Sequence, residues 1–158
     1  MQVRIRSLER EDLVSVALIV DDNQLFPSEA LVEMTANYFE KTSNDKWFVV
    51  CNEFNEIIAV AYAIPEMMTN QTWNLLLIAV LKSWQNKSIG SQLITFIEQY
   101  LQANNARLLI IETSSMPEFE HARSFYQKLG YQITGQIPDF YDEQDDKIIL
   151  FKRLFNKE

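Results

Sequence analysis

Apolar residues in the middle of this chain change from a continuous run to a helical repeat. Leu75–Leu81 is a continuous apolar segment of strand length, and the polar turn Gln85–Ser88 follows it. Beyond the turn the apolar positions lie on one helical face. These positions are Ile89, Leu93, Phe96, Ile97, Tyr100 and Leu101. The pattern predicts a strand, a tight turn and an amphipathic helix, and the other predicted elements are arranged around them.

The same analysis along the chain predicts the order β-α-α-β-β-β-α-β-α-β-β. Strands are expected over Gln2–Leu8, Lys46–Asn52, Ile57–Ile64, Leu75–Leu81, Arg107–Thr113, Tyr131–Ile137 and Lys147–Phe155. Helices are expected from Ser7 or Glu9 to Val20, and over Glu29–Lys41, Ile89–Leu101 and Phe119–Leu129. Pro138–Asp146 is expected to be an acidic loop. We therefore expect an α/β (α+β) fold with a mixed central sheet of about seven strands flanked by about four helices.

Composition narrows the possible functions. The chain of 158 residues is 47% hydrophobic and 23% charged, which is ordinary for a globular protein and predicts one domain over residues 1–158. Its net charge of -8 argues against nucleic acid as the main partner and favours a cationic one. One cysteine, Cys51, and one histidine, His121, make a zinc site improbable, so no metal is expected. Without a signal segment or a membrane-length apolar run, the chain is expected to be cytoplasmic and not to contact a membrane.

A strand that enters a helix through a tight turn leaves the first backbone N–H groups of the helix without intrahelical partners. These donors and the positive end of the helix dipole form a site for phosphate or pyrophosphate. Main-chain donors from about Gln85 to Ser91 are expected to hold such a group, with Lys87 adding a positive charge. The alternative is a solvated turn that only caps the helix.

Two motifs carry a family resemblance. Gln85-Asn86-Lys87-Ser88-Ile89-Gly90 resembles the coenzyme A loop, Gln/Arg-x-x-Gly-x-Gly/Ala, of the GNAT superfamily of N-acetyltransferases, with Ser88 in place of glycine. About 35 residues further on, the segment from Ala122 to Tyr131 resembles that family's A-x-x-(F/L)-Y-x-x-L-G-(F/Y) signature. The element order agrees with the GNAT fold over nearly the whole chain. The resemblance implies acetyl-coenzyme A as the cosubstrate.

The resemblance also implies roles for individual residues. In the family the strand before the loop parts from its neighbour, which frees backbone groups for the pantetheine arm. Ile78 and Val80 would pair with that arm, and the Val80 N–H would polarise the thioester carbonyl. Tyr126 would protonate the leaving thiolate, although a tyrosine on an apolar helical stripe can also be simple core. The implied coenzyme A contacts are Ile78, Ala79, Val80, Gln85, Asn86, Lys87, Ser88, Ile89, Gly90, Ser91 and Tyr126.

The acceptor side is less defined by the sequence. Glu112, at the end of a predicted strand, is the first candidate for the base that deprotonates the amine, directly or through water. Asp139 and Tyr141 follow as candidates and as substrate contacts, because the segment from Asp139 to Asp146 has five acids and no basic residue. That segment either attracts a cationic amine or is only a solvated face. His121 is expected to lie on the surface, and Phe119 replaces an asparagine that often contacts coenzyme A in the family.

The sequence thus predicts an acetyltransferase in which a primary amine, small or peptidic, attacks the thioester directly in a ternary complex. Two alternatives stay open at this point: a coenzyme A-binding module that senses without turnover, and an enzyme that acetylates a protein N-terminus or lysine. A homodimer is possible.

Overall fold

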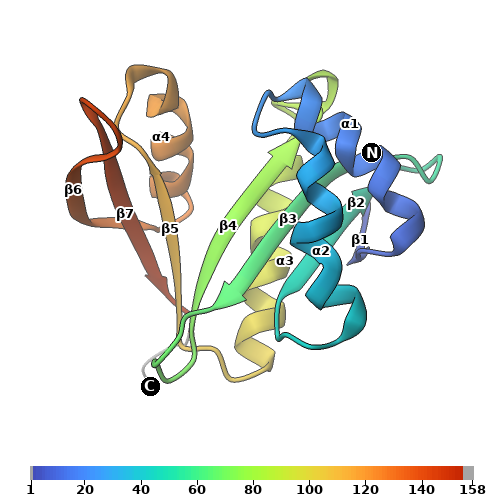
Figure 1. The fold of residues 1–158 in the computed structure, drawn as a ribbon, viewed down its shortest axis with the longest axis horizontal. Coiled ribbons are helices and arrows are strands. Elements are labelled where there is room, and N and C mark those ends of the chain that lie inside the picture. Colours follow the sequence, from blue (N-terminus) through green and yellow to red (C-terminus); the bar gives the residue numbers. More distant parts are fainter. Residues whose placement is uncertain (1, 155–158) are drawn as a thin grey trace. The chain divides into compact units, whose positions relative to one another are not determined.

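A computed structural model describes residues 2–154 of the chain. Its strands are β1 (Arg4–Ser7), β2 (Lys46–Cys51), β3 (Ile57–Pro65), β4 (Thr72–Val80), β5 (Leu108–Ser114), β6 (Gln132–Asp142) and β7 (Asp145–Arg153). Its α-helices are α1 (Leu13–Asp22), α2 (Leu31–Glu40), α3 (Ile89–Ala103) and α4 (Glu120–Lys128) (Figure 1). Short 3-10 helices precede α1, α2 and α4, and a fourth, Lys82–Trp84, follows β4.

The strands form one mixed seven-stranded sheet in the order β1-β2-β3-β4-β5-β7-β6. β4 and β5 are parallel, with Thr72 opposite Leu108 and Leu75 opposite Ile111, as expected for strands joined through a helix. β5 and β7 are antiparallel, and so are β7 and β6. The predicted fold class is therefore confirmed. The predicted end of the last strand at Phe155 lies outside the described residues.

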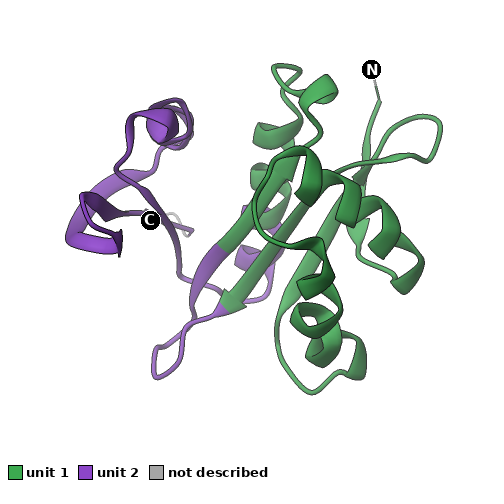
Figure 2. Cartoon of the chain, turned by 45° about the horizontal axis from the view of Figure 1, so that its top comes forward, with its two compact units in different colours: residues 1–64, 76–97 green, residues 65–75, 98–158 purple. Residues whose placement is uncertain are grey.

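The chain divides into two compact units (Figure 2). Unit 1 comprises residues 1–64 and 76–97, and unit 2 comprises residues 65–75 and 98–158. β4 and α3 each run from one unit into the other, so the division follows packing and not the order of the sequence. Whether the chain is one domain, as the sequence predicts, stays a prediction, and each unit is described by itself below.

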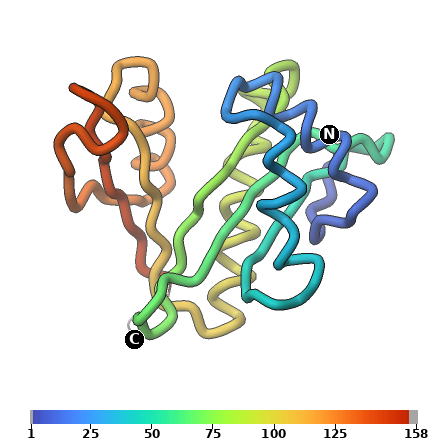
Figure 3. Tube along the Cα trace, in the orientation of Figure 1, coloured from blue at the N-terminus to red at the C-terminus, as the bar shows by residue number. Residues whose placement is uncertain are grey.

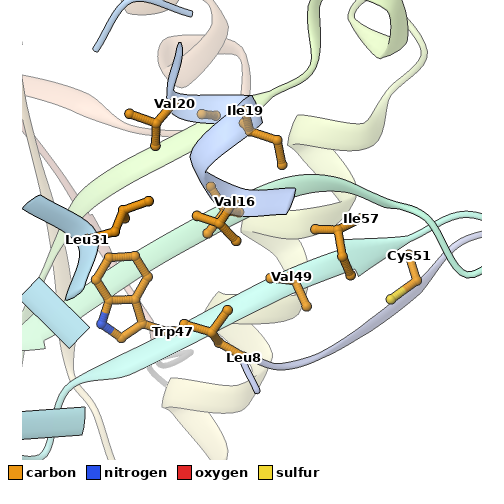
Figure 4. Close-up of a cluster of buried hydrophobic side chains, with 11 residues drawn as sticks. Leu8, Val16, Ile19, Val20, Leu31, Trp47, Val49, Cys51 and Ile57 are labelled. Carbon is orange, nitrogen blue, oxygen red and sulfur yellow. The ribbon is translucent and has the colours of Figure 1, made fainter. Parts of the chain in front are cut away.

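In unit 1 the helices cover both faces of β2 and β3 (Figure 1). A cluster of buried side chains joins α1, through Val16, Ile19 and Val20, to Trp47 and Val49 of β2 (Figure 4). The opposite face of β2 contacts the first part of α3, where the rings of Phe48 and Phe96 meet edge to face at 5.4 Å. Because both faces are covered, β2 is almost wholly apolar. Cys51 is buried.

α1 is anchored at its start by an ion pair. Arg6 of β1 donates to both carboxylate oxygens of Asp12, at 2.7 and 2.9 Å, and the Glu9 N–H donates to the same carboxylate at 2.8 Å. These contacts lower the pKa of Asp12. The pair holds α1 in place, and the far end of α1 reaches the connection between β4 and α3.

The segment Pro138–Asp146 is not the loop that the sequence predicts. β6 continues to Asp142, and a turn at residues 143–144 leads directly into β7. Aspartate side chains allow this extension, because Asp139 accepts the Gln144 N–H and Asp146 accepts the Asp139 N–H, both at 2.8 Å. The strand pairing is irregular between Ile137 and Asp142, which is where a proline can be accommodated.

Among residues 2–154, no helix has the length and apolar character needed to cross a membrane.

α4 ends at Gly130, as its sequence predicts. Gly130 has a φ of 96°, its N–H donates to the Gln127 carbonyl at 3.0 Å, and the Tyr131 N–H donates to the Tyr126 carbonyl at 3.1 Å. This is a Schellman arrangement, and it needs a residue that tolerates the left-handed region. The lysine side chain of Lys152 adds a hydrogen bond to the Leu129 carbonyl at 2.8 Å.

We expect Gly130→Ala to lower the free energy of unfolding by about 1–2 kcal/mol, because a side chain at positive φ is strained. The added Cβ would otherwise meet only Lys152 Cε at an ordinary 3.5 Å. The matched control is Gly135→Ala, whose Cβ would lie 3.6 Å from Ile149 Cδ1 without a positive φ. Urea unfolding measures both. Equal stabilities for the two variants would contradict the assigned role of Gly130.

Candidate functional site

The backbone between β4 and α3 begins with a segment whose polar groups are satisfied. The Leu81 N–H donates to the Ile58 carbonyl of β3 at 2.9 Å, and the Lys82 N–H donates to Asp22 Oδ2 at 2.7 Å. The Trp84 N–H closes the 3-10 turn on the Leu81 carbonyl at 2.8 Å. The segment after α1 lies beside this connection (Figure 3). The start of the loop is therefore fixed to the end of α1.

From residue 86 the pattern reverses. No backbone N–H from residue 86 to residue 91 has a hydrogen-bond acceptor within residues 2–154. The first helical hydrogen bond of α3 runs from the Gln92 N–H to the Ser88 carbonyl at 3.1 Å. Asn86 and Ser88 are both in the left-handed region, with φ of 62° and 63°. A continuous row of unpartnered N–H groups at a helix start is an anion-binding arrangement.

Gln85 contributes differently from its predicted role as a main-chain donor. Its N–H donates to the Lys82 carbonyl at 3.3 Å, so the open row begins at Asn86. The side chain of Gln85 instead donates to the Val80 carbonyl at 3.0 Å and to Asn23 Oδ1 at 3.1 Å. Lys87 is exposed, and its ammonium lies 5.0 Å from the centre of the Trp84 ring. A positive charge therefore accompanies the open N–H groups.

Burial and N–H direction alternate between successive residues at the end of β4. Ala79 is buried in the core cluster of unit 1, whereas Ile78 and Val80 are half-buried. Successive N–H groups of a strand point to opposite edges. Because the Leu81 N–H faces β3, the N–H groups of Val80 and Ile78 face away from β3. These are the two residues whose backbones the family resemblance assigns to the pantetheine arm.

Tyr126 lies in unit 2 on α4 and is 8% exposed. Its ring contacts those of Phe125 at 5.5 Å and Tyr131 at 6.2 Å. Burial raises the pKa of Tyr126 to about 12, so its phenol stays protonated through the neutral range. The neighbouring Tyr131 donates from its hydroxyl to Glu98 Oε2 at 2.7 Å. The two tyrosines differ in that Tyr131 has a carboxylate partner.

Glu112, on β5 in unit 2, belongs to a polar cluster that the sequence did not predict. Asn74 Nδ2 donates to Glu112 Oε1 at 2.9 Å and to Glu66 Oε1 at 2.8 Å, and Lys147 forms an ion pair with Glu112 Oε2. The ammonium of Lys147 also lies 3.6 Å from the centre of the Phe140 ring. Glu112 is thus a paired carboxylate with its side chain 23% exposed.

The pairings at Glu112 follow from strand register. Glu112 is opposite Ile149 in β7, so Lys147, two residues away, is its diagonal neighbour on the same face. Asn74 is opposite Ile110 in β5 and is diagonal to Glu112 in the same way. Single-sequence analysis missed both partners, because neither register can be derived from the spacing of residues alone.

Asp139 and Tyr141 are both exposed on the β6–β7 hairpin. The Asp139 carboxylate accepts the Gln144 N–H, so it stabilises the hairpin. Burial, together with the charges of Glu112 and Asp145, raises the pKa of Tyr141. Asp139 is therefore committed to the turn. His121 is exposed, as expected.

The predicted site residues fall into two groups. Unit 1 holds Val80 and the open N–H row, and unit 2 holds Tyr126, Glu112, Asp139 and Tyr141. Asn23 and Asp22, which bind the loop from α1, were missed by sequence analysis because they lie far from the motif along the chain.

The chain matches the model of a known protein family. Residues 43–133 match the model of the acetyltransferase (GNAT) domain, which is more than half of the chain. The chain therefore belongs to the GNAT acetyltransferase family, whose members are acyltransferases that use acetyl-coenzyme A. The resemblance drawn from the two motifs is confirmed.

Solved structures agree in fold. A Desulfovibrio desulfuricans protein assigned to the GNAT family has a TM-score of 0.88 at 22% identity, covering 98% of this chain and 100% of its own. A variant of spermidine N-acetyltransferase from Vibrio cholerae has a TM-score of 0.81 at 16% identity, with coverages of 97% and 94%. An aminoglycoside 6'-N-acetyltransferase complexed with coenzyme A has a TM-score of 0.77 at 19% identity, with coverages of 98% and 99%. No match was found among curated protein sequences.

Ser88 provides a test of the loop. Its φ of 63° costs a serine on the order of 1 kcal/mol, a cost that glycine avoids. We expect Ser88→Gly to bind acetyl-coenzyme A as tightly as the wild type or more tightly, as measured by calorimetry. Ser88→Ala keeps the Cβ and removes only the hydroxyl, so its affinity should also be unchanged. A loss of about tenfold in both variants would show that the hydroxyl is a required ligand.

Proposed function

We propose that this chain transfers the acetyl group of acetyl-coenzyme A to a primary amine, which attacks the thioester directly in a ternary complex. The observation that carries the proposal is the row of unpartnered N–H groups from residue 86 to residue 91, directly after β4. No cysteine or serine nucleophile is needed, because acetyl-coenzyme A supplies an activated acyl group. Binding both reactants in one site supplies the proximity that the reaction needs.

The residues at the start of α3 fit a diphosphate. The N–H groups of Asn86, Lys87 and Ser88 continue into those of Ile89, Gly90 and Ser91, and the helix dipole is positive at the same end. Lys87 adds a full positive charge, and the carboxylate of Asp22, which binds this connection, is committed to the Lys82 N–H. A diphosphate bound here would receive main-chain hydrogen bonds without any rearrangement of side chains.

The end of β4 is assigned to the thioester. Val80 would donate its N–H to the thioester oxygen and stabilise the negative charge that develops there, a contribution of about 3–4 kcal/mol in comparable sites. Ile78, two residues earlier on the same strand edge, would pair with the pantetheine arm. Ala79 supports this edge through the core and presents no group to the ligand.

Tyr126 is assigned as the general acid that protonates the departing thiolate. Its raised pKa keeps the proton on the phenol until it is needed, and no acceptor among residues 2–154 competes for it. A phenol is a weaker acid than a thiol, so the transfer depends on placing the hydroxyl beside the sulfur.

Glu112 is assigned as the proton acceptor for the amine, directly or through water. Its ion pair with Lys147 and its hydrogen bond from Asn74 fix the carboxylate in one orientation. Tyr141, which is exposed on the hairpin, is assigned as a substrate contact. Asp139 would act at this site only through its charge, because its carboxylate is occupied by the hairpin turn.

The acceptor proposed here is a primary amine that carries further positive charge. The chain has a net charge of -8, Asn74 joins Glu66 to Glu112, and Asp145 of the β6–β7 hairpin accepts a hydrogen bond from Ser114 at the end of β5. Two of the structural neighbours are named for cationic amines, spermidine and an aminoglycoside. Release of free thiol from acetyl-coenzyme A should therefore require an added amine.

The direct test is a panel of amines assayed by thiol release. We expect polyamines and aminoglycosides to support turnover better than a neutral primary amine of similar size, and their KM to rise with ionic strength as charges are screened. Absence of thiol release with every amine and peptide in the panel would overturn the proposed activity. If turnover occurs but its KM does not respond to salt, the cationic acceptor is contradicted and the acetyltransferase activity is not.

Tyr126→Phe tests the general acid. We expect kcat to fall on the order of a hundredfold or more, while the Kd for acetyl-coenzyme A changes by less than about threefold. The matched control is Tyr131→Phe, which removes a buried hydroxyl that donates to Glu98. We expect this variant to have a lower free energy of unfolding and a kcat close to that of the wild type. An unchanged kcat in Tyr126→Phe would remove Tyr126 from the reaction.

A further inference from the structure

The carbonyl of Val80 accepts two side-chain amides. Asn23 Nδ2 and Gln85 Nε2 each donate to it at 3.0 Å, and Gln85 Nε2 also donates to Asn23 Oδ1 at 3.1 Å. Asn23 Nδ2 further donates to the Ile19 carbonyl in the last turn of α1, at 3.0 Å. The three groups form a closed ring of hydrogen bonds, which we call the Val80 clamp: Asn23, Gln85 and the Val80 carbonyl.

The Val80 clamp determines which backbone groups remain available. A carbonyl oxygen has two lone pairs, and both of those on Val80 are used. The following N–H, that of Leu81, donates to Ile58 in β3. On the edge of β4 that faces away from β3, the Val80 N–H is therefore the group that Val80 can offer to a ligand. The Val80 carbonyl and the Leu81 N–H belong to one planar peptide group, so these hydrogen bonds fix the plane of the peptide that directly follows the Val80 N–H.

We propose that Asn23 and Gln85 are positioning residues that hold the Val80 N–H in the direction required by the thioester oxygen. This inference rests on the proposed function, because it concerns the N–H assigned there as the donor. Its physical basis is preorganisation: a donor that is held in place before the reaction stabilises developing charge without paying for reorientation. Neither side chain touches the reacting atoms in this assignment, since both bind the Val80 carbonyl, which belongs to the next peptide group along the chain.

The chemistry of the clamp predicts which substitutions it tolerates. The side chain of Gln85 must be long enough to reach the Val80 carbonyl and must end in a hydrogen-bond donor. Gln85→Met removes the donor and keeps a neutral side chain of similar length. Gln85→Arg restores N–H donors at the same position. Asn23 supplies both a donor and an acceptor, and Asn23→Ala removes both. Because Gln85 is exposed and Asn23 lies after the end of α1, both variants are expected to fold.

The experiment measures kcat and the KM for acetyl-coenzyme A in the full chain, with the best amine from the panel. We expect kcat to fall about tenfold or more in Gln85→Met and in Asn23→Ala, with KM changing by less than about threefold, and Gln85→Arg to recover most of kcat. The double variant should lose little more than either single variant, because the clamp is one unit. Gln102→Met, an exposed glutamine near the far end of α3, is the matched control and should keep the wild-type kcat.

A spectroscopic readout separates positioning from simple support of the loop. Isotope-edited infrared spectra of bound acetyl-coenzyme A report the strength of the hydrogen bond to the thioester carbonyl. The carbonyl frequency should be lowered on binding to the wild type, and this shift should be reduced in Gln85→Met and recovered in Gln85→Arg. A merely structural role would leave the shift unchanged in the molecules that still bind.

The outcomes distinguish the two proposals. Turnover by the wild type that survives intact in Gln85→Met and Asn23→Ala overturns the inference and leaves the proposed function standing. A fall confined to affinity, with kcat and the carbonyl shift unchanged, also overturns it. Absence of turnover in the wild type with every amine overturns the proposed function, and the inference with it.

Discussion

The junction between β4 and α3 divides one stretch of backbone into two parts. From the Val80 carbonyl to the Gln85 N–H the polar groups described above are satisfied, by β3, by the 3-10 turn and by side chains at the end of α1. From residue 86 to residue 91 the N–H groups have no acceptor within the described part of the chain. Unpartnered N–H groups destabilise a fold unless water or a ligand can reach them, and the start of a helix is a place where this is possible. The satisfied segment before residue 86 holds the row in position. The account of this protein depends on that division.

Main-chain chemistry also explains how the motif tolerates change. Ser88 can replace the usual glycine because the donor at this position is an N–H, which every residue except proline supplies. The cost is confined to local backbone strain at a φ of 63°. Side chains matter mainly at the boundary of the row, where Gln85 turns inward to the Val80 carbonyl. The sequence pattern of the loop therefore reflects backbone geometry more than side-chain chemistry.

Local patterns predicted the elements well, for identifiable reasons. Four residues of the predicted helical face, Ile89, Leu93, Ile97 and Leu101, are almost fully buried, and Gly130 ends α4 because its positive φ suits glycine. The strand-to-helix motif was readable because its donors come from consecutive residues. The two strands of the β6–β7 hairpin were predicted, but their extension through Pro138–Asp146 was missed, because a proline and a run of acids are typical of a loop. Two of those aspartates accept backbone N–H groups and thereby extend the strands.

Long-range partners could not be read from the sequence. Lys147 meets Glu112 only through the register of β5 with β7, and Asn23 meets Val80 only through the packing of α1 beside β4. Both contacts alter the interpretation of a predicted residue. Glu112 is a carboxylate held in one orientation by its partners. Gln85, which shares the Val80 carbonyl with Asn23, binds the protein backbone with its side chain. The roles of such residues depend on side chains that lie dozens of positions away along the chain.

The most direct test of the central claim is a nuclear magnetic resonance titration that follows the backbone N–H signals as coenzyme A is added. The account predicts that the largest shifts on binding fall on residues 86–91, and that pantetheine, which lacks the diphosphate, leaves those signals nearly unchanged. Binding of coenzyme A with these signals unmoved, or no binding at millimolar concentration, would contradict it.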